Sequence, residues 1–212
     1  VPDILQALAD VDMHAIQTSG NTIRNVTTDH LAGAALDEIA DPRPYAEWIR
    51  QWSTDHPEFQ FLPRKFKIAI SGGVSDRAVI RAHDIGLRLV PGMESVAFDI
   101  YVGGGLGRTP VVGARVFEQV AIDDLLPHLE AIVSVYNLHG RRDNKYKARF
   151  KILLQSMGKE AFKREVTGFL KHNRDAFDGS ELSELTRIQD DFLMRSLPPK
   201  DAASYWERID TD

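Results

Sequence analysis

Cysteine is missing from this 212-residue chain, and several chemistries are excluded with it. The chain's own residues cannot form a disulfide, supply a thiolate nucleophile or ligate an iron–sulfur cluster through cysteine. No two histidines have the three- or four-residue spacing of helical metal ligands, so the sequence predicts no metal site. A chain without disulfides is compatible with the cytoplasm, where we expect the protein.

The chain also lacks an excess of positive charge and any long apolar run. Its formal net charge is -5 and its pI is about 5.8, which argues against general binding to nucleic acid or to a membrane surface. No apolar run approaches the roughly 18 residues of a membrane-spanning helix, and the N-terminus does not resemble a signal peptide. The length and the 43% hydrophobic content predict one sizeable core, or one domain with an appended tail.

Helical and strand patterns alternate along the sequence. Apolar spacing and capping residues predict helices over residues 2–11, 45–52, 75–83, 123–138, 146–157, 159–171 and 181–195. Strands are predicted over residues 13–17, 62–70, 86–90, 96–102 and 115–120. Pro198 and Pro199 mark a break after the last helix. Because some strands follow one another too closely for crossover helices, we predict an α+β domain with a mixed β-sheet flanked by helices.

Two lysines interrupt the strand predicted at residues 62–70. Side chains alternate along a strand, so Phe66 lies on one face, while Lys65, Lys67 and Ala69 share the other. Burying one ammonium group is costly, and two side by side also repel, unless an anion neutralises them. The alternative is an edge strand whose lysines face water and deter aggregation. The strand alone leaves both interpretations open.

Three consecutive glycines, Gly103, Gly104 and Gly105, follow a predicted strand. A dinucleotide-binding fingerprint would open a helix at this point, and residues 108–112 do not start one. Two interpretations remain. The loop backbone approaches a flat or anionic ligand very closely, or it forms a plain turn between strands.

Residues 141–151 carry six basic residues and one acid in an otherwise acidic protein. Lys145 and Arg149 are four residues apart, so on the predicted helix they would project from the same face. Guanidinium groups grip carboxylates with two hydrogen bonds, which suits a ligand with several carboxylates. A solvated charged surface is the alternative.

Four segments of the chain carry a family resemblance. Residues 22–27 (TIRNVT), 62–67 (LPRKFK), 102–106 (VGGGL) and 144–151 (NKYKARFK) resemble, in the same order, the siroheme-dependent sulfite and nitrite reductases. The chain resembles the central domain of an assimilatory sulfite reductase hemoprotein (beta component), as a fragment. The resemblance implies reduction of sulfite to sulfide at a siroheme coupled to a 4Fe-4S cluster. It also implies that ferredoxin or an NADPH flavoprotein donates the electrons.

The resemblance also assigns roles to individual residues. Arg24, Lys65 and Lys67 would surround the anion at the siroheme iron, neutralise its oxygens and supply protons, and Lys145 and Arg149 would hold siroheme carboxylates. The other predicted cofactor-binding residues are Asn25, Thr27, Arg64, Gly103, Gly104 and Gly105. The cluster ligands would lie outside this chain, which we therefore expect to be inactive on its own.

On this basis the chain divides into three segments. Residues 1–20 are a helix and linker from the preceding half of a longer enzyme, residues 21–172 form the siroheme- and substrate-binding domain, and residues 173–212 are an acidic helical extension of that domain. Plant-type nitrite reductases of the family typically carry asparagine where this chain has Lys67, so sulfite is the predicted substrate. A nitrite reductase, or a non-catalytic module that binds anions or tetrapyrroles, is the alternative.

Overall fold

The computed structural model of the chain describes residues 1–11, 13–54, 56–93 and 95–196. At its centre is a four-stranded sheet with the order β1-β2-β3-β4. The strands are β1 (Ile68–Ser71), β2 (Ile85–Pro91), β3 (Val96–Val102) and β4 (Ala114–Ala121). Strands β1 and β2 are parallel and the other neighbours are antiparallel, so the predicted mixed sheet of an α+β domain is confirmed.

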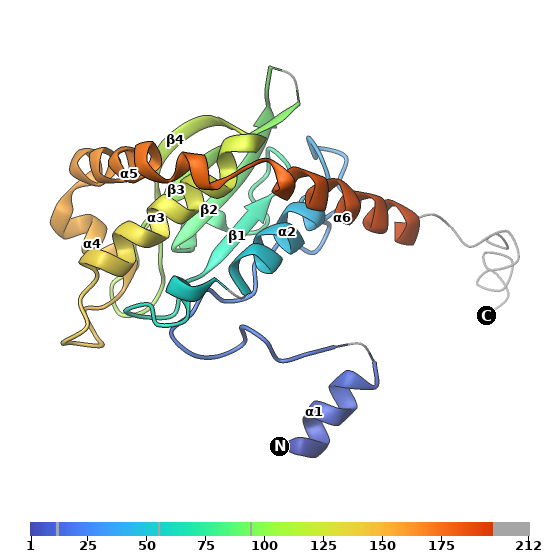
Figure 1. Cartoon of the computed structure of the whole chain (residues 1–212), viewed down its shortest axis with the longest axis horizontal. Coiled ribbons are helices and arrows are strands. Elements are labelled where there is room, and N and C mark those ends of the chain that lie inside the picture. Colours follow the sequence, from blue (N-terminus) through green and yellow to red (C-terminus); the bar gives the residue numbers. More distant parts are fainter. Residues whose placement is uncertain (12, 55, 94, 197–212) are drawn as a thin grey trace, which may run out of the picture.

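The main hydrophobic core lies between the sheet and its helices (Figure 1). Helices α2 (Arg43–Thr54) and α3 (Leu125–His139) contribute many of its buried side chains, and the rings of Tyr45 and Phe98 meet edge to face. Helices α4 (Phe150–Met157) and α5 (Lys159–Asn173) pack with α3, and α6 (Ser180–Ser196) packs against α2. Because strand side chains alternate, the opposite face of the sheet carries a smaller cluster that includes Ala69 and Tyr101.

The remaining elements are short or peripheral. Helix α1 (Pro2–Ala9) has no buried residue and stands away from the sheet in Figure 1. Four 3₁₀ turns complete the described chain: η1 (Pro57–Phe59), η2 (Ile80–Ala82), η3 (Ile122–Asp124) and η4 (Arg174–Ala176).

Most of the predicted elements are present in the structure. The strands predicted at 86–90, 96–102 and 115–120 are β2, β3 and β4, and the helices predicted at 45–52, 123–138, 159–171 and 181–195 are α2, α3, α5 and α6. The helix predicted at 2–11 is confirmed as the shorter α1. The break predicted at Pro198 and Pro199 lies outside the described residues.

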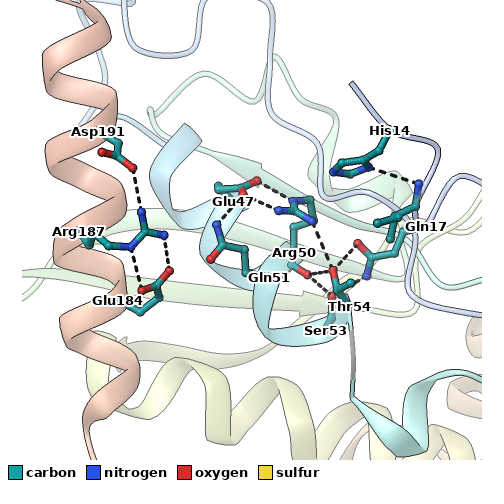
Figure 2. A network of polar contacts seen from close by, with 11 residues as sticks. His14, Gln17, Glu47, Arg50, Gln51, Ser53, Thr54, Glu184, Arg187 and Asp191 are labelled. Atoms are coloured by element: carbon teal, nitrogen blue, oxygen red, sulfur yellow. Dashed lines mark hydrogen bonds and ion pairs between the residues drawn. The ribbon is translucent and has the colours of Figure 1, made fainter. Parts of the chain in front are cut away.

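The strand predicted at residues 13–17 is wrong, because side chains and not a sheet anchor this segment. Gln17 has a positive φ of 59°, which a strand does not accommodate. Its amide donates to the Ser53 hydroxyl over 2.9 Å and accepts from the Thr54 hydroxyl over 3.3 Å (Figure 2). The end of α2 thus holds the chain directly before the loop that leads to Arg24.

The helix predicted at residues 75–83 is also wrong. The Ser75 amide donates to the Asp37 carboxylate over 3.1 Å, and the Arg77 guanidinium reaches the same carboxylate over 2.8 Å. Val79 then adopts a positive φ of 52°, so only the 3₁₀ turn η2 follows. Contacts between distant segments override the local helical pattern here.

Candidate anion-binding site

The segment 22–27 runs beside β1 and the residues that lead into it. The Phe66 amide donates to the Thr22 carbonyl over 3.0 Å, the Arg24 amide donates to the Phe66 carbonyl over 2.8 Å, and the Ile70 amide donates to the Thr27 carbonyl over 2.8 Å. These bonds pair the outer edge of β1 with this segment, although β1 remains the terminal strand of the sheet and Lys67 faces water. The predicted strand is also shorter than expected, because β1 begins at Ile68 and both lysines precede it.

Lys65 and four other cations form one cluster, in which the charges of the other four act on Lys65. The pKa of Lys65 is lowered, first by the charge of Lys67, then by partial burial and by the charges of Arg24, Arg149 and Arg64. Lys67 is exposed, whereas the other four are half-buried. Like charges held this close repel one another, so a bound anion would stabilise the arrangement.

Loop carbonyls hold Arg24 in place. Its Nη1 donates to the Thr18 carbonyl and its Nη2 donates to the Gly20 carbonyl over 2.9 Å. Its Nε is buried, and the described part of the chain offers this atom no partner. The same is true of Arg149 Nε. Buried donors without partners are rare and costly, and Arg77 Nη2 and Arg88 Nε are two others among the described residues.

Arg149 belongs to this cluster, but the helical argument that paired it with Lys145 is wrong. Helix α4 begins at Phe150, and Arg149 is its extended N-cap with φ -69° and ψ 145°. The Asn144 side chain instead accepts from the Tyr146 amide in a turn, and the Lys145 ammonium lies 5.3 Å from the Tyr146 ring centroid. A role for Lys145 in binding carboxylates remains a prediction.

The first two residues of the triple glycine pack against Leu154 and the Arg81 main chain, whereas the third lies beside cationic side chains. Gly103 has a positive φ of 76°, and a Cβ on Gly104 would lie 2.2 Å from the Arg81 carbonyl oxygen. These two glycines are therefore explained by the turn itself. A Cβ on Gly105 would lie 3.5 Å from Arg149 Nη2, so the end of the loop lies beside the cation cluster.

The other two predicted residues of the arginine loop, Asn25 and Thr27, are exposed. Thr27 contributes through its main chain, which pairs with Ile68 and Ile70. Cofactor contacts from the two side chains remain predictions.

Sequence reasoning missed two residues of the site. Asp84 is fully buried and pairs with Arg149, and Lys151 is buried with its ammonium donating to the carbonyls of Leu106 and Thr109 over 3.1 and 2.6 Å. Lys151 lies in the basic segment but was not singled out. Asp84 is a lone acid before an apolar strand, a pattern without a functional signature.

Comparison with known proteins identifies the family. The family model described as "Nitrite and sulphite reductase 4Fe-4S domain" matches residues 19–174. The chain belongs to the nitrite and sulphite reductase family. This confirms the family resemblance of the four motif segments.

Curated relatives of both substrate types are similar to this chain. The sulfite reductase [ferredoxin] 1 of Mycolicibacterium paratuberculosis is 35% identical over 84% of this chain and 32% of its own length. The chloroplastic ferredoxin–nitrite reductase of Arabidopsis thaliana is 31% identical over 78% of this chain and 29% of its own length. This chain thus spans about a third of the curated relatives that it matches.

Solved structures confirm the fold. The NirA protein of Mycobacterium tuberculosis superposes with a TM-score of 0.72 at 34% identity, covering 80% of this chain and 31% of NirA. Dissimilatory sulfite reductase I superposes with a TM-score of 0.62 at 10% identity, covering 78% of this chain and 57% of that protein, and shows the fold alone.

The two cofactors that the family implies fit this chain differently. The family model is named for a 4Fe-4S cluster, but the chain has no cysteine and so offers the cluster no thiolate ligand. Among the described residues no group of three or more metal-ligating side chains gathers either. An anionic cofactor does fit, because among the described residues Arg149 is the one member of the cation cluster with an acidic partner, Asp84, and the other four cations have none. In the part of the chain that the structure describes, no helix is long and apolar enough to cross a membrane.

Proposed function

We propose that this chain is the substrate- and siroheme-facing domain of a sulfite reductase. The observation that carries the proposal is the convergence of Arg24, Lys65, Lys67 and Arg149 in one cluster beside the glycine loop. Siroheme, when bound, would supply the iron and the redox chemistry. The electrons would come from an external donor, for which ferredoxin is the class named by the curated relatives. An NADPH flavoprotein remains the second prediction for the donor.

While siroheme would supply the redox chemistry, the chain itself would contribute positive charge and protons. Arg24, Lys65 and Lys67 would neutralise the oxygens of a bound oxyanion, since preorganised cations act strongly where negative charge gathers. The Lys65 and Lys67 ammonium groups are the proton donors that the cluster offers to an oxygen that leaves as water. Arg149 would bind carboxylates at the rim of the cofactor.

The second cation of the lysine pair favours sulfite over nitrite. Deprotonated sulfite carries two negative charges and nitrite carries one, so an additional ammonium at Lys67 stabilises sulfite more. Nitrite remains the second candidate, because relatives with both substrate names are similar to this chain at comparable identity.

Kinetics on the longer reductase that contains this domain test the proposal. We expect reduction of sulfite with a higher kcat/KM than that of nitrite, and loss of both activities when Lys65 is replaced by alanine. A longer protein that binds siroheme but reduces neither anion would instead support the non-catalytic module.

A further inference from the structure

Asp84 sits where the parallel pair of strands begins. In that pair Ile68 lies opposite Ile85, so Lys67 and Asp84 stand one step before the ladder. The Lys67 amide donates to Asp84 Oδ2 over 3.0 Å. The Asp84 carboxylate thus gives the Lys67 amide an acceptor directly before the β1–β2 ladder begins. This hydrogen bond fixes the main chain that carries Lys67.

The same carboxylate holds the Arg149 guanidinium. Arg149 Nη2 donates to Asp84 Oδ1 over 3.0 Å and to Oδ2 over 3.2 Å, and the Asp84 side chain has no exposed surface. The Asp84 carbonyl also accepts from the Gly103 amide over 2.9 Å. One buried residue therefore touches the lysine segment, the glycine loop and the basic segment, which lie far apart in the sequence.

We propose that Asp84 is a positioning residue that orients the Arg149 guanidinium and holds it in register with Lys67. The identity of the ligand rests on the proposed function, whereas the contact between Asp84 and Arg149 does not. Without the carboxylate, Arg149 would lose its ion-pair partner while the like charge of Lys65 stays nearby, so the guanidinium would turn away. Burial raises the pKa of Asp84, and the charge of Arg149 acts against this rise by favouring the ionised carboxylate.

A matched control distinguishes this role from general support of the fold. Asp99 on β3 is also buried, and it accepts from Arg115 Nη1 over 2.9 Å and from the Gln119 amide over 3.2 Å. Asp99 thus has the same kinds of partner as Asp84, and neither Asp99 nor Arg115 is among the groups whose charges lower the pKa of Lys65. Asp99→Asn should cost stability without changing the site.

The first test is a double-mutant cycle on siroheme retention in the longer reductase, measured by absorbance of the purified proteins. Asp84→Asn keeps the volume and an acceptor for the Lys67 amide, and we expect it to weaken retention about tenfold, the size of a charged hydrogen bond. If Asp84 acts through Arg149, adding Asp84→Asn to Arg149→Ala should cause no further loss. Losses that multiply, or an equal loss in Asp99→Asn, would overturn the proposal.

The second test needs neither siroheme nor a variant of Asp84. Nitrogen NMR of the 212-residue chain, with the signal assigned through Arg149→Lys, reports rotation of the Arg149 guanidinium. We expect slow rotation with distinct Nη signals, whereas fast averaging would refute the positioning role. If Arg149→Ala leaves siroheme retention unchanged, the proposed cofactor contact fails, and the NMR result still shows whether the Arg149 guanidinium is held in place.

Discussion

Gly104 and Gly105 of the loop should respond differently to alanine, because each lies against something different. A Cβ on Gly104 would lie 2.2 Å from the Arg81 carbonyl oxygen and 2.6 Å from that of His83, and neither main-chain group can move alone. We therefore expect Gly104→Ala to lower the free energy of unfolding by about 1–3 kcal/mol or more, the range for an overpacked interior. The atoms nearest to a Cβ on Gly105 would be side-chain atoms of Lys151, at 3.2 Å, and of Arg149, at 3.5 Å. Gly105→Ala should therefore be the milder change for the fold, and it should act mainly on siroheme retention.

Urea unfolding of the chain followed by circular dichroism measures the first effect, and siroheme absorbance of the longer reductase measures the second. Gly168→Ala in α5 is the matched control, because its Cβ would meet nothing within 4 Å. This control should leave stability unchanged or raise it by about 0.5–1 kcal/mol. Equal stability of Gly104→Ala and wild type would refute the packing argument, and unchanged siroheme retention in Gly105→Ala would separate the loop from the cofactor.

Four further predictions concern the cations and the chain as a whole. Arg149→Ala in the longer reductase should weaken siroheme retention by about 1–3 kcal/mol, which absorbance would record. Lys67→Asn should shift the ratio of kcat/KM values toward nitrite by roughly tenfold, in steady-state kinetics with both anions. Sulfate should stabilise the chain at neutral pH: at ten times its Kd it should raise the free energy of unfolding by about 1.4 kcal/mol, which a higher Tm would record. The effect should shrink as pH rises through the lowered pKa of Lys65. The purified 212-residue chain should produce no sulfide from sulfite with any electron donor, because it supplies no ligand for the cluster.

The sign of the pH effect follows from the lowered pKa of Lys65. Between that pKa and the ordinary value of 10.5, the unfolded chain binds the proton more tightly than the folded chain. Without an anion, stability should therefore rise with pH in this window, while anion binding weakens because one cation is lost. A sulfate effect that is independent of pH there, or equal in Lys65→Met, would contradict this assignment. The prediction for Arg149→Ala fails if siroheme retention is unchanged, and that for Lys67→Asn fails if the ratio of kcat/KM values is unchanged. Sulfide production by the isolated chain would contradict the last one.

Periodicity predicted the elements that are stabilised by their own apolar faces. The aromatic stripe of α2 and the apolar residues of β2 and β3 form local patterns that were enough to predict these elements. Prediction failed where contacts between distant segments determine the backbone conformation. Gln17 is anchored by Ser53 of α2, and Val79 follows the ion pair of Arg77 with Asp37; both residues have a positive φ.

The candidate site shows the same division. The family resemblance pointed to Arg24, Lys65 and Lys67, and the structure brings them together. The resemblance did not reveal Asp84, because its partners are 17 and 65 residues away and no local spacing connects them. The helical register assumed for Lys145 and Arg149 failed because the Asn144 turn delays the start of α4.

The most direct test of the account is the kcat/KM for sulfite of the longer reductase with each anion-site cation removed. Arg24→Ala, Lys65→Ala and Lys67→Ala should each lower kcat/KM at least about tenfold, because each cation neutralises charge on the reacting anion. Lys171→Ala, an equal change of charge at an exposed position of α5, should leave kcat/KM unchanged. Values for the three variants that match those of wild type and the Lys171 control would contradict the claim that this cluster binds the substrate.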